Sequence, residues 1–143
     1  MQEDLIPYRQ LSLDAVMAAH VIYDCMDCNT AVFSSKWIDY LRNDIKFNGV
    51  VFTDDLSMEG ACVVGGMLNR VDTAYHAGCD MLVVCNSPES VGEVLANWQP
   101  ILDPLRAKRI EMLRPRQAGK DWARLQCDPV YQSAKKTIAQ CCV

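Results

Sequence analysis

Short apolar runs alternate along the chain with segments of helical periodicity. Three of the runs are bounded by polar or turn-forming residues, and their sequences are DAVMAAH, GVVFT and DMLVVCN. Runs that are apolar on both faces are typical of strands in a parallel sheet that helices cover. We therefore expect three buried parallel strands, over Asp14–His20, Gly49–Thr53 and Asp80–Asn86.

Helix signals occupy the segments between these runs. Ser34 or Ser35 can cap a helix over Lys36–Asn43, which carries apolar residues at helical spacing. A second helix is expected over Val71–Ala77 and should end at Gly78, a residue that favours the C-cap. Glu3–Gln10 is expected to be the end of an amphipathic helix. Further helices are expected after Ser87-Pro88-Glu89 and from Pro104 onward, where Pro115 and Asp128-Pro129 divide the segment.

The resulting order is helix, strand, helix, strand, helix, strand, helix, which indicates the α/β class. It fits either a doubly wound sheet or part of a (β/α)8 barrel. A complete barrel takes roughly 250 residues, and this sequence has 143. By length alone the chain would hold only part of a barrel, so both alternatives stay open, with 104–143 expected to form a C-terminal helical segment.

Composition narrows the classes of partner. Half of the residues are apolar, 22% are charged and the net charge is -4, which is typical of a soluble globular protein and unlike a nucleic-acid binder. The basic cluster Arg106–Arg116 is expected to form a solvated helix face, with an anion site as the alternative. We find no apolar run long enough to span a membrane and no signal-peptide pattern. The expected location is the cytoplasm, with no nucleic-acid and no membrane partner.

The chain contains eight cysteines, which are expected to be reduced because a chain of this length needs no disulfide staples. Cys62, Cys79 and Cys85 lie in apolar stretches and are expected to act as small core residues. Cys25 and Cys28 have the spacing of a redox or zinc motif, but a structural zinc site needs four ligands. No matching second pair follows, so neither a metal nor a cofactor is expected.

Two adjacent carboxylates, Asp54 and Asp55, follow the second predicted strand. Side chains alternate across a strand. If Asp54 faces a barrel interior with Val50 and Phe52, then Asp55 faces the helices. The two acids therefore do not form one catalytic pair. The carboxyl end of a strand is where α/β enzymes hold their chemistry. From position alone, Asp54 is either a functional carboxylate or a cap of the following loop, and Asp55 is structural, accepting loop N–H groups.

Three segments carry a family resemblance: 14–23 (DAVMAAHVIY), 49–60 (GVVFTDDLSMEG) and 77–86 (AGCDMLVVCN). In order and spacing they resemble segments of bacterial cytoplasmic β-N-acetylglucosaminidases of glycoside hydrolase family 3, and TDDLSM is the most specific part. The resemblance implies a (β/α)8 TIM barrel, of which this chain would form the C-terminal portion, about strands 6–8 with their helices, as one partial barrel domain over residues 1–143.

The same resemblance implies an activity and its site. The reaction would be retaining hydrolysis of terminal β-linked N-acetylglucosamine, through a covalent intermediate on the nucleophile Asp54 and without a metal. The substrates would be muropeptides of peptidoglycan recycling. Two further residues are candidates for substrate binding. His20 could line the barrel mouth or hold a loop by hydrogen bonds, and Met58 could pack against the acetamido group or against the barrel rim.

The sequence also departs from the family pattern. These enzymes carry a Lys-His-Phe-Pro-Gly-His-Gly-like segment and an Asp-x-His loop that acts as general acid/base, and neither occurs in this sequence, whose histidines are His20 and His76. General acid–base catalysis is worth roughly 100- to 10,000-fold, so the isolated chain is expected to be inactive or nearly so. An alternative is a non-catalytic half-barrel that binds sugar or a partner, or self-associates through its open sheet edges. A third is complementation by a separate chain that carries strands 1–5.

Overall fold

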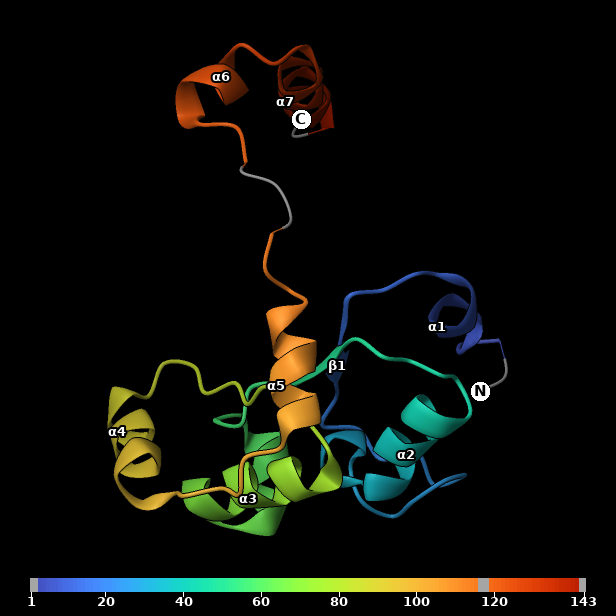
Figure 1. Ribbon diagram of the computed structural model, residues 1–143, viewed down its shortest axis with the longest axis vertical. Coiled ribbons are helices and arrows are strands. Elements are labelled where there is room, and N and C mark those ends of the chain that lie inside the picture. The colour runs from blue at the N-terminus through green and yellow to red at the C-terminus, as the bar shows by residue number, and fades with distance from the viewer. Residues whose placement is uncertain (1–2, 116–118, 142–143) are drawn as a thin grey trace. The chain divides into compact units, whose positions relative to one another are not determined.

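The computed structural model describes residues 3–115 and 119–141 of the chain. The chain divides into two compact units, Met1–Leu113 and Arg114–Val143. The first unit contains these elements in order (Figure 1): α1 (Ile6–Gln10), β1 (Ala15–Ala18), η1 (Ala31–Phe33), α2 (Ser35–Asn43), β2 (Val50–Thr53), η2 (Glu59–Val64), α3 (Met67–Ala77), α4 (Pro88–Asn97) and α5 (Pro104–Glu111). The second unit contains α6 (Trp122–Gln126) and α7 (Pro129–Cys141).

The first two predicted strands are confirmed in shortened form. β1 and β2 pair in parallel, with Ala15 opposite Val50 and Ala18 opposite Thr53. They are joined by a crossover that contains η1 and α2, as expected for a parallel pair. The alternation of helices and parallel strands is therefore that of an α/β unit.

The prediction of a third strand over Asp80–Asn86 is wrong in detail. Only Met81 forms a bridge, which is parallel and opposite Phe52. Further along the segment, side chains of the β2 region replace backbone carbonyls as acceptors: the N–H of Val83 donates to Thr53 Oγ1 at 2.8 Å, and that of Cys85 to Asp55 Oδ1 at 2.9 Å. The segment thus follows β2 without completing a backbone ladder.

Two predicted helix ends are confirmed by their local geometry. Ser34 precedes α2, and its hydroxyl accepts the N–H of Trp37 at 3.2 Å. α3 ends at Gly78, whose φ of 112° favours glycine. A Cβ at position 78 would also lie 2.8 Å from Cγ2 of Ile38, so this glycine permits α2 and the end of α3 to approach closely.

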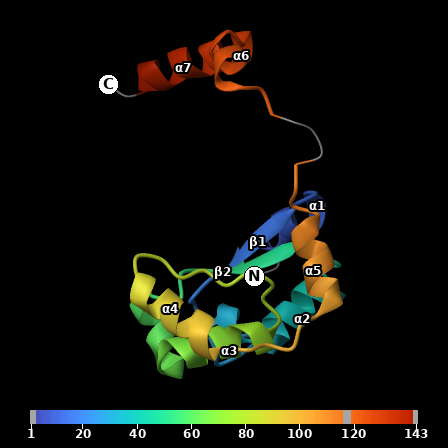
Figure 2. The same cartoon turned by 60° about the vertical axis from the view of Figure 1, so that its left-hand side comes forward.

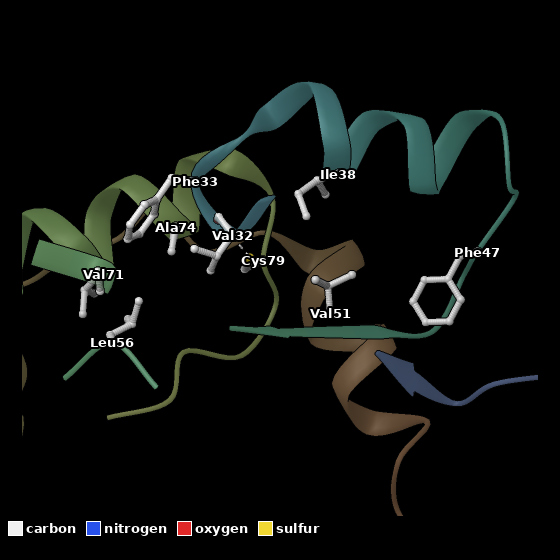
Figure 3. Close-up of a cluster of buried hydrophobic side chains, with 10 residues drawn as sticks. Val32, Phe33, Ile38, Phe47, Val51, Leu56, Val71, Ala74 and Cys79 are labelled. Carbon is white, nitrogen blue, oxygen red and sulfur yellow. Dashed lines mark hydrogen bonds between the residues drawn. The ribbon is translucent and has the colours of Figure 1, made fainter. Parts of the chain in front are cut away.

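The hydrophobic core lies between β2 and the helices that cover one of its faces (Figure 3). Val51 points from β2 into this core, where it meets side chains from η1, α2 and α3. The fully buried members include Val32, Leu56, Ala74 and Cys79. Burial of a Val, Leu, Ile or Phe side chain is worth about 1.5–3 kcal/mol, so these contacts hold the helices against one face of β2.

A buried carboxylate, Asp80, ties three elements together. Its side chain is fully buried, and Oδ2 accepts the N–H of Val51 at 2.8 Å and Nη2 of Arg42 at 2.6 Å. Oδ1 accepts both Nε and Nη2 of Arg109, at 2.9 and 2.7 Å. Burial lowers the pKa of the Arg42 guanidinium, while the adjacent Asp80 carboxylate acts in the opposite direction. One side chain therefore joins α2, β2 and α5.

The prediction that the basic cluster forms a solvated helix face is wrong for two of its members. The side chains of Arg106 and Arg109 are only 12% and 21% exposed. Arg106 lies 3.5 Å above the ring of Tyr75 and donates to the carbonyl oxygen of that residue at 3.0 Å. Arg109 and Arg106 both lie near the carboxylate of Asp80, which is an anion within the protein itself. Arg116 lies outside the described residues.

The second unit is a pair of helices that meet at the predicted break. Asp121 caps α6 through the N–H of Arg124, and Asp128 Oδ1 accepts the N–H groups of Val130 and Tyr131 at the start of α7. The ring of Trp122 meets that of Tyr131 edge-on, with 6.2 Å between centroids.

Replacing Asp80 with asparagine should destabilise the first unit strongly. Asp80→Asn would leave the guanidinium groups of Arg42 and Arg109 without a counter-charge in a largely buried position, which typically costs about 3–5 kcal/mol. Urea denaturation followed by circular dichroism measures the change. Asp39→Asn, at an exposed position of α2, is the matched control and should change stability by less than about 0.5 kcal/mol. Equal effects of the two substitutions would contradict the role given to Asp80.

Candidate active site

The candidate site lies where β1 and β2 end. Because the strands are parallel, their carboxyl ends meet at one edge of the sheet (Figure 2). The N–H of Asp54 donates to the carbonyl oxygen of Ala18 at 2.9 Å, which joins the two strand ends directly. The residues that follow each strand are thereby brought together, including the predicted site residues His20, Asp54 and Met58.

Asp54 follows the last residue of β2 and is half-buried. Val51 packs into the helix-facing core, so strand alternation directs Val50, Phe52 and Asp54 toward the opposite face. One carboxylate oxygen, Oδ1, accepts the N–H of Asp55 at 2.8 Å. This local bond fixes the orientation of the carboxylate and is also the kind of contact that a loop cap makes, so geometry supports both interpretations of Asp54.

Asp55 has a clear structural role. Its carboxylate accepts the N–H of Ser57 at 2.9 Å, the hydroxyl of Ser57 at 2.6 Å and the N–H of Cys85 at 2.9 Å. Burial acts to raise the pKa of Asp55, but these hydrogen bonds and the nearby His20 outweigh it, and the pKa lies below its usual value. The expectation that Asp55 accepts loop N–H groups is confirmed.

The carbonyl oxygen of Asp55 is a second junction in the same loop. It lies 3.0 Å from Nε2 of His20 and accepts the N–H of Met58 at 3.1 Å. A carbonyl oxygen only accepts, so Nε2 of His20 carries a hydrogen and donates it to this oxygen. Nδ1 is buried and has no hydrogen-bond partner among the described residues. His20 thus holds the loop by a hydrogen bond, and its contact with substrate stays a prediction.

Met58 stands at the start of η2, directly after the TDDLS segment. Its side chain is 45% exposed, so the residue lies on the rim of the strand ends. A contact between this side chain and a substrate stays a prediction.

A brace that the sequence did not reveal stabilises the loop after Asp54. Arg70, on α3, donates to the carbonyl oxygens of Leu56 at 2.8 Å and Gly65 at 2.7 Å, and Nη2 lies 3.1 Å from Sγ of Cys62. Its signal in the sequence was only a basic residue near the start of a helix. Cys62 is exposed, so its predicted place in the core is wrong. Cys79 is fully buried, as predicted, and Cys85 is partly buried.

Two further properties concern the described residues as a whole. Within them, His, Cys, Asp and Glu side chains form no group of three or more that could hold a metal ion. No helix in residues 3–115 and 119–141 has both the length and the apolar character that crossing a membrane requires.

The sequence matches the family model described as "Glycosyl hydrolase family 3 N terminal domain" over residues 1–114. Among curated proteins, it is 45% identical over 141 residues to a beta-hexosaminidase of Aromatoleum aromaticum, covering 96% of this chain and 40% of that protein. A beta-hexosaminidase of Bordetella parapertussis is 43% identical, with 98% of this chain and 41% of that protein covered. The chain therefore spans about two fifths of the length of these relatives.

A solved structure supports the same relationship. NagZ from Neisseria gonorrhoeae, in complex with N-trifluoroacetyl-D-glucosamine, superposes with a TM-score of 0.81 at 35% sequence identity. The superposition covers 96% of this chain and 41% of that chain.

Removing the charge of Asp55 should lower stability in a pH-dependent way. Its pKa is depressed in the folded state, so its stabilisation is present above the unfolded value near 3.9 and is lost as the pH falls through the folded value. Asp55→Asn should therefore unfold at a lower temperature than the parent chain at pH 6, and the gap should narrow toward pH 3. Thermal unfolding across this range measures it.

Asp54→Asn is the matched control for this experiment. The Asp54 carboxylate accepts one hydrogen bond, from the neighbouring backbone N–H, whereas the Asp55 carboxylate accepts three, two from backbone N–H groups and one from the Ser57 hydroxyl. Asp54→Asn should lower the unfolding temperature less than Asp55→Asn does at pH 6. A gap for Asp55→Asn that stays constant from pH 6 to pH 3 would contradict the assigned role.

Proposed function

Since the chain belongs to the family of the glycosyl hydrolase family 3 N-terminal domain, we propose that it is part of a retaining β-N-acetylhexosaminidase whose nucleophile is Asp54. By family the chain is a glycoside hydrolase, and its domain is of the TIM-barrel-like α/β type. Within that barrel, we assign it to about strands 6–8 and their helices, with residues 104–143 as the C-terminal helical segment.

One observation carries the proposal: Asp54 ends the parallel strand β2 within the segment GVVFTDDLSMEG, and strand alternation directs it away from the helix-covered core. The carboxyl end of a barrel strand is where such enzymes hold their reacting groups. The neighbouring Asp55 is occupied by three hydrogen bonds that order the loop. Asp54 is therefore the carboxylate of the pair that is suited to react.

In the proposed reaction, the second oxygen of the Asp54 carboxylate, Oδ2, attacks the anomeric carbon of the sugar. The glycosidic C–O bond breaks, and a general acid donates a proton to the leaving oxygen. Water, deprotonated by the same group acting as base, then attacks the anomeric carbon and releases both the sugar and the Asp54 carboxylate. In this chain Asp55 N–H holds Oδ1 at 2.8 Å, which keeps the attacking group in a fixed orientation.

The proposed substrate is a terminal β-linked N-acetylglucosamine. The related Neisseria gonorrhoeae enzyme is in complex with N-trifluoroacetyl-D-glucosamine, which supports a sugar bearing an acylated amine. We extend the proposal to muropeptides of cell-wall recycling in the cytoplasm, with His20 and Met58 at the site rim as contacts to the sugar. Release of N-acetylglucosamine from purified muropeptides is the direct assay for this extension.

The nucleophile is testable in a chimaera in which residues 1–143 replace the matched region of the Aromatoleum aromaticum beta-hexosaminidase. The chimaera should hydrolyse an aryl N-acetyl-β-glucosaminide, and Asp54→Asn should lower kcat by about 10,000-fold or more, as loss of a nucleophile typically does. A fluorinated substrate analogue that stalls the covalent intermediate should label the peptide that contains Asp54, as mass spectrometry would show.

Asp39→Asn in the same chimaera is the matched control, because Asp39 is an exposed acid on α2, and it should retain full kcat. Label on another residue, or undiminished turnover by Asp54→Asn, would refute the proposed nucleophile.

The 143 residues alone should be nearly inactive on the same aryl substrate. The sequence holds no counterpart of the family's acid/base loop, and the absence of general acid–base catalysis costs roughly 100- to 10,000-fold before any loss of the sugar pocket is counted. Initial rates with the purified chain, measured against the chimaera, test this. Comparable rates from the two proteins would show that the chain supplies its own acid/base group.

A further inference from the structure

We propose that His20 is a positioning residue for the reaction at Asp54, whose carboxylate it fixes through the backbone of Asp55. This role rests on the proposed function and goes beyond a contact between His20 and the sugar. A sugar contact would contribute to substrate binding, whereas positioning acts on the reacting carboxylate itself. The two roles therefore predict different changes in KM and kcat.

Two hydrogen bonds connect the His20 ring to the Asp54 carboxylate. Nε2 of His20 donates to the carbonyl oxygen of Asp55 at 3.0 Å, and the N–H of the same Asp55 donates to Oδ1 of Asp54 at 2.8 Å. The backbone of Asp55 is therefore bonded at both its carbonyl and its N–H. Rotation of this backbone would move the N–H away from Oδ1, so an anchor on the carbonyl also sets the direction of the carboxylate.

The His20 ring is itself held on a firm support. It lies against the ring of Phe33, with 5.7 Å between centroids, and Phe33 belongs to the buried core (Figure 3). The residues before and after His20, Ala19 and Val21, are bonded to η1 through their carbonyl oxygens, at 3.2 and 2.9 Å. A Cβ at Gly60 would lie 3.1 Å from Cβ of His20, so η2 also packs closely on this residue. A donor that is fixed in this way can position the group that it contacts.

The other contacts of the Asp55–Leu56 peptide do not replace His20. On its other side, the N–H of Leu56 donates to the carbonyl oxygen of Val83 at 2.8 Å. The N–H of Met58 donates to the same carbonyl as His20 does, but Met58 belongs to the loop that must be held. Among the described residues, His20 is thus the side chain that ties this peptide to the end of β1. Without its donor, the peptide would be held from one side only.

His20→Phe removes the donor and keeps an aromatic ring that can pack against Phe33. Misplacing a reacting group by about 1 Å can cost about 100-fold in rate. In the chimaera with the Aromatoleum aromaticum enzyme, His20→Phe should therefore lower kcat by about 10- to 100-fold and leave KM nearly unchanged. His20→Gln, whose amide N–H can donate to the same carbonyl, should recover most of the lost kcat.

His76→Phe is the matched control, because it makes the same substitution at the other histidine of the chain. Nδ1 of His76 also contacts a backbone carbonyl, at 2.9 Å, but that carbonyl belongs to Asp72 in the same helix. The His76 side chain is 71% exposed. This variant should keep the kcat and the KM of the parental chimaera.

Labelling with the fluorinated substrate analogue separates positioning from a purely structural role. The His20→Phe chimaera should label the Asp54 peptide about tenfold or more slowly than the parental chimaera, but to the same final fraction. A substitution that only unfolds part of the protein would lower the final fraction and leave the labelling rate of the remainder unchanged. That result would overturn the proposal, as would a parental labelling rate. A raised KM with unchanged kcat would also overturn it, because it would show a contact with the sugar alone.

Amide exchange in the 143-residue chain tests the connection without any catalysis. In His20→Phe the N–H of Asp55 should exchange about tenfold or more faster than in the parent chain. The N–H of Val50, which donates to the carbonyl oxygen of Asp14 beside β1, should keep its rate. Unchanged exchange at Asp55 would overturn the proposal. Label on a residue other than Asp54 in the parental chimaera would instead refute the proposed nucleophile, and exchange at Asp55 would still decide whether His20 fixes the Asp54 carboxylate.

Discussion

The arrangement of the first unit depends on the buried carboxylate of Asp80. A charge that is removed from water must be paired and hydrogen-bonded, and here Arg42, Arg109 and the N–H of Val51 fulfil that requirement. The pairing fixes where α2 and α5 lie relative to β2. It also places Asp80 one residue before the bridge at Met81, so the same carboxylate sets the position at which the third segment meets the sheet.

The strand β2 connects the Asp80 cluster to the candidate site: Asp80 accepts the N–H of Val51 in this strand, and Asp54 follows its last residue. Val51 is held at one end of the strand by Asp80, and Thr53 and Asp55 at the other end accept the N–H groups of Val83 and Cys85. The segment after Asp80 is therefore joined to β2 by side chains at several points. Asp54 lies between two of these attachment points, which is why its backbone is well fixed although its carboxylate makes only a local bond.

The features that could be predicted from sequence are those set by local chemistry. Ser34 caps α2, Gly78 ends α3, and two of the apolar runs form strands, because each depends on a few neighbouring residues. The role of Asp80 could not be predicted, since Arg42 lies 38 residues and Arg109 29 residues from it. For the same reason α5 was expected to expose its basic residues to solvent. The partners of Arg106 and Arg109, Tyr75 and Asp80, lie 31 and 29 residues away in the sequence.

The adjacent carboxylates show how a strand end can divide structural and chemical roles. Alternation places the two side chains on different sides, and the loop and the neighbouring segment supply three donors to Asp55. Those bonds favour the ionised form of Asp55 and would make it a poor nucleophile, since attack would require breaking them. A reactive carboxylate needs the opposite: a fixed backbone and an oxygen free to approach the substrate. The hydrogen bonds that stabilise Asp55 are thus what allow Asp54 to remain available.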